Sequence, residues 1–326
     1  GRKDGSSWAN AATISSLSKI IAAAGPGGEV LLRADQGAYK LGSEVHIRAG
    51  GTAEAPVTIR GVDVNGVARS AEFIGTRAEN WQPGLSEGRE VFRLLDGADH
   101  LQFENLSFKN IGNGAFRVGS DITDLTIEHV TASNVGRFIE NWVSGTATSA
   151  TVDGLTVRDV DIHGYSRAGV IRLKYDTHNV LIEDVVGDSQ RQNGGLYMSG
   201  VTLDDTVHDV VLRRVTMKNN YGNGGPDDYW NGDGFTTERG VYNVRFEDTV
   251  ASGNTDSGYD LKSKNTVLVR AIAEDNTRNY KLWSDSITLQ DSVSLNPHPK
   301  GGWNVQGHIQ LTENAKVTMI GGRIVD

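Results

Sequence analysis

The sequence predicts an all-β solenoid, a fold in which the chain winds into successive coils that stack on one another. A strand pattern of alternating apolar residues recurs every 20 to 34 residues from about Leu101 onward. In addition, Phe235, Tyr259 and Tyr280 follow equivalent turns at spacings of 24 and 21 residues. β-rich repeats of this length are typical of solenoids, in which each coil buries its apolar face against its neighbours.

The chain has 326 residues, which we interpret as one elongated domain over residues 1–326, because a solenoid can grow in one direction. Forty glycines against six prolines suit a chain that turns often. The formal net charge of −9, without a basic stripe, argues against a nucleic-acid partner. An acidic protein can still bind an acidic polymer through a cation. The lack of cysteine excludes disulfides and thiolate chemistry.

The sequence gives no sign of a membrane anchor, since no apolar run approaches 18 residues. The start at Gly1-Arg-Lys-Asp also lacks the apolar core of a signal peptide. We expect a secreted or periplasmic bacterial protein, acting as a monomer, whose signal peptide is not part of this chain.

The N-terminal segment predicts the one helix of the chain. Residues 13–24 carry apolar side chains at helical spacing, and Gly25-Pro26-Gly27-Gly28 follows as a stop signal. The open end of a solenoid exposes apolar core and unpaired strand edges, so we expect residues 1–30 to form a cap. Short strands are expected next, at 29–32, 45–47 and 57–60.

Each later coil begins with a strand whose apolar residues alternate, which places apolar side chains inward and polar ones outward. The predicted inward pairs are Leu125/Ile127, Leu155/Val157, Val180/Ile182, Val210/Leu212, Val244/Phe246, Val267/Val269, Ile287/Leu289 and Val317/Met319. A polar turn residue follows each strand: Asn110, Asn134, His163, Ser189, Asn219, Asn254, Asn276 or Asn296. Asparagine tolerates the left-handed conformation and can bond to the next coil, which predicts an asparagine ladder. The alternative is ordinary turn composition.

After the turn, a third type of strand places its first residue inward and its second outward, as in Leu196-Tyr197 and Tyr280-Lys281. Because adjacent strands lie about 4.8 Å apart, the outward residues should form one exposed column. Its predicted members are Arg172, Tyr197, Thr236, Asp260 and Lys281. Long loops near 143–152 and 221–233 are expected to flank a cleft over this column. Trp230, on the second loop, could stack on a sugar ring or pack the loop.

Asp233, Asp256 and Asp260 belong to adjacent coils. Three converging carboxylates form an oxygen-rich site of the type that Ca²⁺ prefers, and they disfavour zinc. The alternative is that these aspartates cap turns and face water.

Lys281 lies one coil beyond Asp260 in the predicted column. A bound cation would lower the pKa of this lysine by repulsion, and the neutral amine would be a base. A cation on a substrate carboxylate also stabilises the carbanion formed when the neighbouring carbon loses its proton. The pair therefore suits β-elimination, favoured at alkaline pH. The alternative is a solvated or carboxylate-paired lysine.

Three runs together resemble the calcium and catalytic region of family 9 polysaccharide lyases, the pectate lyase group: Asp233-Gly-Phe, Asn254-Thr-Asp-Ser-Gly-Tyr-Asp-Leu and Asn279-Tyr-Lys-Leu. The resemblance implies a right-handed parallel β-helix, Ca²⁺ held by Asp233, Asp256 and Asp260, and Lys281 as general base. The family pattern has a second aspartate where this chain has Ser257. Asp227 or Asp228 could replace that ligand from the loop.

The resulting hypothesis is a Ca²⁺-dependent lyase that cleaves a pectate-like, uronic-acid-containing polysaccharide. Arg172 and Arg191 are candidates for binding uronate carboxylates, and Tyr197 is a candidate acid toward the leaving oxygen. One alternative is a β-helical glycoside hydrolase, which would use two carboxylates among Asp227, Asp228 and Asp233 without a metal. Another is a carbohydrate-binding β-helix without catalytic activity.

Overall fold

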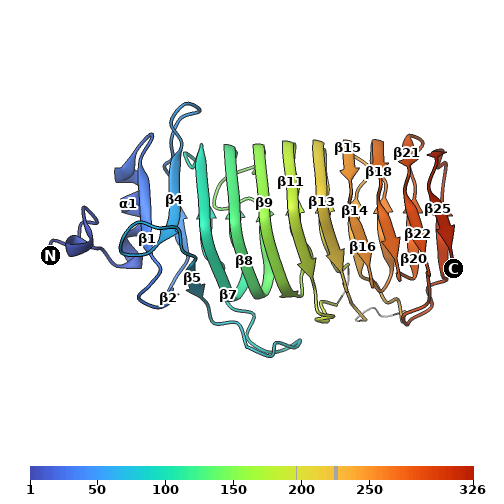
Figure 1. Cartoon of the computed structure of the whole chain (residues 1–326), viewed down its shortest axis with the longest axis horizontal. Helices are drawn as coiled ribbons and strands as arrows, with labels where there is room; N and C mark the ends of the chain where they lie inside the picture. The colour runs from blue at the N-terminus through green and yellow to red at the C-terminus, as the bar shows by residue number, and fades with distance from the viewer. Residues whose placement is uncertain (196, 224–226) are drawn as a thin grey trace.

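The computed structural model describes residues 1–195, 197–223 and 227–326 and shows a parallel β-helix, which confirms the predicted fold. The strands pair in parallel into a single network of 25 strands. Their coils stack side by side along the long axis, from the N-terminal helix at one end to β25 at the other (Figure 1).

The helical segments are η1 (Trp8–Asn10), η2 (Ile14–Ser16) and α1 (Leu17–Ala24). The first strands are β1 (Glu29–Arg33), β2 (Tyr39–Lys40), β3 (Val45–Ile47), β4 (Val57–Val62), β5 (Ala71–Ile74), β6 (Phe92–Leu94), β7 (Leu101–Val118), β8 (Ile122–Asn141), β9 (Val152–Tyr165), β10 (Ala168–Leu173), β11 (His178–Asp188), β12 (Ser199–Leu203) and β13 (His208–Lys218). The remaining strands are β14 (Asp233–Thr237), β15 (Tyr242–Glu247), β16 (Val250–Ser252), β17 (Ser257–Leu261), β18 (Lys264–Val269), β19 (Ile272–Glu274), β20 (Arg278–Leu282), β21 (Ile287–Gln290), β22 (Val293–Leu295), β23 (Gly307–Leu311), β24 (Val317–Ile320) and β25 (Arg323–Val325).

Each coil contributes to three parallel ladders. The last five strands of the first ladder are β13, β15, β18, β21 and β24. The long strand β13 also contributes to the second ladder, which continues through β16, β19, β22 and β25. The third ladder contains β10, β12, β14, β17, β20 and β23. In chain order a coil passes from the first ladder to the second and then to the third, so loops border the third ladder on both edges.

The interior is built from the alternating apolar positions that the sequence predicted. Phe235, Tyr259 and Tyr280 are fully buried and stack on one another, with ring centroids 4.9 and 5.1 Å apart. Such offset aromatic stacks add stabilisation beyond the buried area. The predicted alignment of these three residues is therefore confirmed.

The predicted inward pair Val267/Val269 was wrong by one residue. Backbone pairing aligns Thr266 with Val244 and Leu268 with Phe246, so Thr266 and Leu268 point inward. The cause is the uninterrupted run Val267-Leu268-Val269, in which alternation cannot tell the two faces apart. A slip of one residue exchanges the faces of a strand.

A buried asparagine ladder connects coils beside the third ladder. Asn220 donates to Asn254 and Asn254 donates to Asn276, each over 2.8 Å. A separate pair joins Asn134 to Asn110 at 2.9 Å. The prediction of Asn219 was wrong by one residue, because Asn219 takes the left-handed turn with φ 60° and bonds outward to Asp188.

The N-terminal helix covers the open end of the first coils, as predicted. It begins at Leu17, later than expected, because Ile14–Ser16 form a 3-10 turn. Leu17 and Ile21 are buried in the core, and the helix ends at Ala24, followed by Gly25, whose φ of 65° suits glycine. In the described ranges we find no helix that is both long and apolar enough to cross a membrane.

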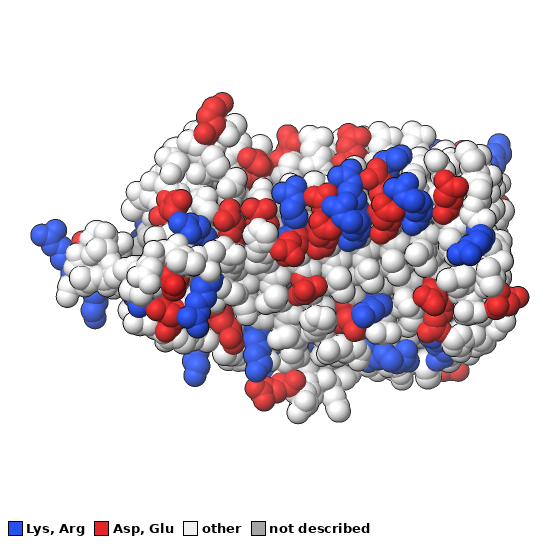
Figure 2. Space-filling model, viewed as in Figure 1, with Lys and Arg blue, Asp and Glu red and all other residues white. Residues whose placement is uncertain are grey.

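The first ladder carries a row of alternating basic and acidic side chains along the long axis, and Figure 2 shows this face. Arg213 bridges Glu183 and Glu247 at 3.1 and 2.7 Å, and Arg158 also pairs with Glu183 at 2.9 Å. The two arginine side chains keep 36–40% of their surface exposed. We call Arg158, Glu183, Arg213 and Glu247, with the neighbouring pair Asp248–Arg270, the exposed charge row.

Candidate functional site

The third ladder carries an outward column of residues that aligns across five coils. Backbone pairing places Arg172 beside Thr202, Thr202 beside Thr236, Thr236 beside Asp260, and Asp260 beside Lys281. The predicted positions of Arg172, Thr236, Asp260 and Lys281 in one column are therefore confirmed. Adjacent members belong to neighbouring strands and so lie about 4.8 Å apart along the helix axis.

The prediction that Tyr197 belongs to this column was wrong, and Thr202 takes its place. Tyr197 lies in the loop before β12, has a φ of 61° and is 73% exposed. Its predicted inward neighbour Leu196 lies outside the described residues. The loop between β11 and β12 is longer than the repeat suggested, so Val201 holds the inward position. The predicted role of Tyr197 as an acid depended on its place in the column, which it does not occupy.

The N-terminal part of the column is rich in arginine. Arg172 aligns with Glu140, Glu140 with Arg117, and Arg117 with Arg93. Arg93 and Arg117 were not among the predicted site residues, and both contact the buried carboxylate of Glu90, Arg117 at 3.8 Å. Guanidinium groups pair with carboxylates through two parallel hydrogen bonds. This part of the column suits an anionic ligand.

Segments outside the strands adjoin both edges of the third ladder. Residues 142–151 leave the third ladder after β8, whereas residues 227–232 lead into it before β14. Trp142 is 42% exposed after β8, and the guanidinium of Arg172 lies 5.3 Å from its ring centroid. On the other side, the rings of Tyr229 and Trp303 lie 5.4 Å apart. Aromatic side chains are thus present at both edges of the column.

Trp230 and Arg191 both lie beside Tyr221. The indole of Trp230 donates to Asp228 over 2.9 Å, and its ring meets that of Tyr221 edge-on at 5.7 Å. The guanidinium of Arg191 lies 4.5 Å from the Tyr221 ring centroid. In this arrangement Trp230 packs its own loop, and the substrate-binding roles of both residues stay predictions.

Of the three predicted calcium ligands, Asp233 begins β14, Asp256 directly precedes β17 and Asp260 lies within β17. Asp256 and Asp260 are buried, and Asp233 is partly buried and accepts a hydrogen bond from the Ser257 amide at 2.8 Å. Burial, reinforced by the charges of Asp256 and Asp260, raises the pKa of Asp233 well above its usual range. Burial also raises the pKa of Asp260, although Lys262 and Lys281 oppose this shift. The folded protein therefore disfavours three full negative charges here.

Both oxygens of Asp256 are already bonded within the protein. Arg278 donates its Nε to Oδ1 over 2.9 Å and its Nη2 to the same oxygen, while the Tyr229 hydroxyl donates to Oδ2. The Asp256 side chain has no exposed surface and that of Arg278 has 8%. The other terminal nitrogen of Arg278 donates to Gln310 over 3.1 Å. Asp256 and Arg278 therefore form a buried, fully bonded ion pair.

Lys281 is the cation of the site that keeps freedom to react. Its Nζ lies 3.8 Å from Oδ2 of Asp260, too long for a hydrogen bond, and 4.8 Å from the ring centroid of Trp283. The indole of Trp283 donates to Oδ1 of Asp260 over 2.7 Å. Trp283 thus fixes the carboxylate beside the amine. The Lys281 side chain is 13% exposed, which leaves its amine within reach of a ligand on the column.

These contacts do not fit a Ca²⁺ ion held by all three aspartates. Calcium takes six to eight oxygen ligands, and the oxygens of Asp256 are occupied by Arg278 and Tyr229. The loop residues Asp227 and Asp228 are exposed, and Asp228 accepts from the Trp230 indole. Their role as replacement ligands stays a prediction.

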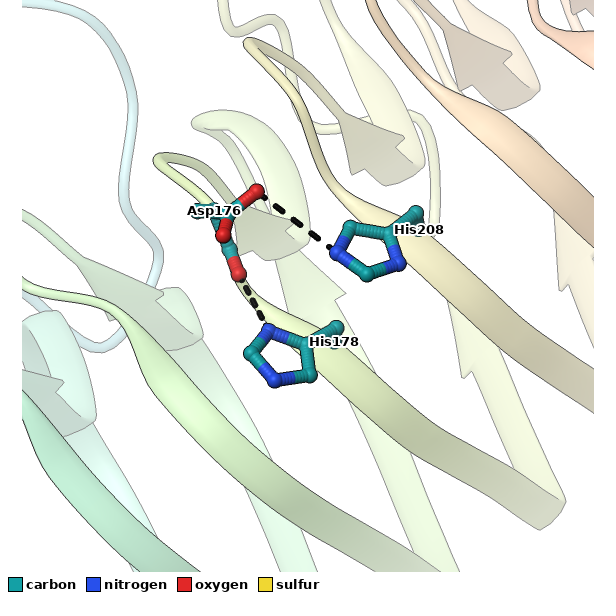
Figure 3. A group of neighbouring side chains, drawn as sticks. All are labelled: Asp176, His178 and His208. Carbon is teal, nitrogen blue, oxygen red and sulfur yellow. Dashed lines mark hydrogen bonds and ion pairs between the residues drawn. The ribbon is translucent and has the colours of Figure 1, made fainter.

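In the part of the chain that the structure describes, one trio of His, Cys or acidic residues brings its ligand atoms within 4.8 Å of one another: Asp176, His178 and His208 (Figure 3). The two imidazoles stack with their centroids 4.8 Å apart and their planes 6° apart. Because imidazole lone pairs lie in the ring plane, these parallel rings cannot both point at one ion. Tyr242 continues the stack at 4.7 Å, which indicates a surface ladder of rings.

Arg278 is the important residue that the sequence analysis missed, although a signal for it exists. Asp233, Ser257 and Arg278 each stand two residues before the aligned aromatic residues Phe235, Tyr259 and Tyr280. The alignment that identified the aspartate in the first coil would also have identified the arginine two coils later. Tyr229 carried no such signal, because it lies in a loop outside the repeat.

No protein-family model and no curated protein matches the chain. Solved structures do match. Pectate lyase Pel9A is similar with a TM-score of 0.65 and 16% identity, over 94% of this chain and 76% of that protein. The A-module of the Azotobacter vinelandii mannuronan C-5 epimerase AlgE4 gives 0.56 and 14%, over 95% and 91%. A rhamnogalacturonan lyase gives 0.54 and 11%, over 90% and 77%. At these identities the similarity establishes the parallel β-helix fold alone.

Proposed function

We propose that this protein cleaves a uronic-acid-containing polysaccharide by β-elimination, with Lys281 as the general base. The observation that carries the proposal is the column on the third ladder, where Lys281 lies next to Asp260 and in line with Arg172. The arginine end offers partners for substrate carboxylates, and the lysine end offers a base. The similar structures include polysaccharide lyases and an epimerase, which supports a polysaccharide substrate.

The reaction follows from the acidity of the carbon next to a carboxylate. The amine of Lys281 takes the proton from C5 of a uronate, and the electron pair of that bond forms a double bond between C4 and C5. The bond from C4 to the glycosidic oxygen breaks, and the leaving oxygen takes a proton from a donor or from water. Asp260 and Trp283 hold the surroundings of the amine in place. General-base catalysis of this kind contributes about 10²- to 10⁴-fold in rate.

Calcium as a cofactor stays a prediction, and no step of this proposal passes through the ion. The similarity to Pel9A and AlgE4 concerns the fold and not a bound ion. The present contacts of Asp256 argue against the predicted set of three ligands. Export from the cell is part of the proposal, because polymers of this class are outside the cell.

A glycoside hydrolase is the second candidate, and one observation favours it. The raised pKa of Asp233, which results from burial and the neighbouring Asp256 and Asp260, keeps its carboxyl group protonated to higher pH than usual. A protonated carboxyl group can serve as the general acid of hydrolysis, with a second carboxylate as partner.

The test is a panel of polymers, including polygalacturonate, alginate and glucuronan, incubated with Ca²⁺ or with a chelator. A rise in ultraviolet absorbance from unsaturated uronate ends supports the lyase and identifies its polymer. New reducing ends without that absorbance would support the hydrolase. A change of sugar configuration by NMR, without chain cleavage, would indicate an epimerase that shares the proton-abstraction step. Lys281→Ala should abolish either proton-abstraction activity, and Lys281→Arg is the control that keeps the charge.

A further inference from the structure

We infer that the guanidinium of Arg278 takes the place of a divalent cation in this site, so that the carboxylate cluster is neutralised by the protein itself. The inference concerns the same residues as the proposed function, but it is a statement about the cation and not about the reaction. Three carboxylates, from Asp233, Asp256 and Asp260, face the guanidinium of Arg278, which hydrogen bonds hold in place. The amines of Lys262 and Lys281 also offset the charge of Asp260. A site neutralised in this way has little charge left to attract Ca²⁺.

The backbone register explains why this arginine reaches the cluster. Ser257 aligns with Arg278 on the next coil, and the amide of Ser257 donates to Asp233 over 2.8 Å. Asp233, Ser257 and Arg278 therefore follow one another along a second column beside Asp256. At the middle position the resemblance to the lyase family predicts an aspartate, but this chain has serine. One carboxylate fewer and one guanidinium more at adjacent positions both make the site more positive, and together they supply the charge that a divalent cation would bring.

The geometry leaves an ion no entry to Asp256. Arg278 contributes two nitrogens to Oδ1, Tyr229 contributes its hydroxyl to Oδ2, and Gln310 holds the far side of the guanidinium at 3.1 Å. Both members of the ion pair are buried. An incoming Ca²⁺ would have to displace a buried guanidinium and leave it unpaired, which is strongly unfavourable.

The experiment measures Ca²⁺ binding without substrate, by isothermal titration calorimetry on chelator-treated protein. The wild-type protein should show no binding. The double variant Ser257→Asp/Arg278→Ser restores the aspartate and removes the guanidinium, so it should bind Ca²⁺ and gain about 5 °C in Tm at 100 times the Kd. Arg278→Lys keeps a cation at this position and should show no Ca²⁺ binding. The control Arg270→Ala removes an arginine from the exposed charge row and should also stay silent.

Two results would overturn the inference. One is a wild-type Ca²⁺ isotherm that Asp233→Asn abolishes; this measurement does not depend on whether the double variant folds. The other is a folded double variant that binds no Ca²⁺. If the double variant folds only when Ca²⁺ is added, as followed by circular dichroism, the inference is supported. Failure of the polymer assay beside a silent wild-type titration would refute the proposed lyase and leave the inference standing.

Discussion

Two sets of ion pairs, built on the same coils, differ in what surrounds them. In the exposed charge row on the first ladder, Arg213 lies between Glu183 and Glu247 with more than a third of its side chain in water. On the third ladder, Asp256 and Arg278 are joined by hydrogen bonds of similar length but have almost no exposed surface. The contacts look alike, but their energetic consequences should be very different.

The cost of desolvation, and not the number of ion pairs, decides which charged residues affect the stability of this molecule. In water the two partners of an exposed pair are well solvated when separated, so the pair adds little stability. A buried charge that loses its partner keeps the full cost of desolvation. The raised pKa of Asp233, caused first by burial, reports the same effect in the same cluster. Buried titratable groups with shifted pKa values are commonly found at functional sites, so this cluster is where function is expected.

The largest expected effect comes from breaking the buried pair. Arg278→Ala should lower the free energy of unfolding by about 3–5 kcal/mol, because Asp256 would stay buried without its cation. Denaturant unfolding followed by circular dichroism measures the change. Asp256→Asn/Arg278→Gln replaces both charges and should recover a large part of the loss. A loss below about 1 kcal/mol for Arg278→Ala would show that this buried pair contributes no more than an exposed one.

The second prediction separates chemistry from stability inside the buried region. Lys281 lies 3.8 Å from Asp260 without a hydrogen bond, and Lys262 also offsets the charge of that carboxylate, so Lys281→Ala should cost clearly less stability than Arg278→Ala. On the polymer identified by the assay it should lower kcat by about 100-fold or more, since the base is lost. Lys264→Ala removes an exposed lysine of the first ladder and is the matched control. Full activity of Lys281→Ala would remove this residue from the mechanism.

Much of the fold could be predicted because short local patterns in the sequence identify each repeat. Phe235, Tyr259 and Tyr280 follow equivalent turns, and alternation sets the inward face wherever polar residues separate apolar ones. Prediction failed where that local signal is lost. At Val267-Leu268-Val269 both faces are apolar, and before β12 a long loop moved the column position from Tyr197 to Thr202.

The sequence predicted where the candidate site lies, but not which cations pair with its carboxylates. The column of Thr236, Asp260 and Lys281 follows from the repeat alone. The role of Arg278 depends on which neighbour its long side chain reaches, and the partner, Asp256, lies on the preceding coil. The contribution of Tyr229 comes from a loop whose path the repeat does not determine. Side-chain pairing across coils therefore decides what an acidic cluster can bind.

The buried cluster and the exposed charge row should respond to pH in opposite directions. The pKa of Asp233 is raised by burial and by Asp256 and Asp260, from an unfolded value of about 3.9. Its contribution to stability is therefore full below that value and is lost as pH rises through the folded pKa. Asp233→Asn cannot ionise, so at pH 7 without Ca²⁺ it should be more stable than wild type, and this advantage should disappear as pH falls toward the unfolded pKa.

Urea unfolding between about pH 2 and pH 8 tests this, because the curves of wild type and Asp233→Asn should diverge as pH rises. The control is Asp248→Asn, in which the sign is reversed. The hydrogen bond from Arg270 lowers the pKa of Asp248, so its contribution is present above the unfolded pKa and is lost as pH falls. Parallel curves for wild type and Asp233→Asn would contradict the burial of a charged cluster at this site.

The smallest effect is expected in the exposed charge row itself. Arg270 donates to both oxygens of Asp248, at 2.6 and 2.9 Å, yet its side chain is 56% exposed. Arg270→Ala should shift Tm by less than about 2 °C, because water solvates Asp248 once the arginine is gone. Any difference from wild type should vanish in 1 M salt, where the Debye length is only about 3 Å. A salt-resistant loss comparable to that of Arg278→Ala would show that the row acts as a cooperative network, and that exposure alone does not separate the two regions.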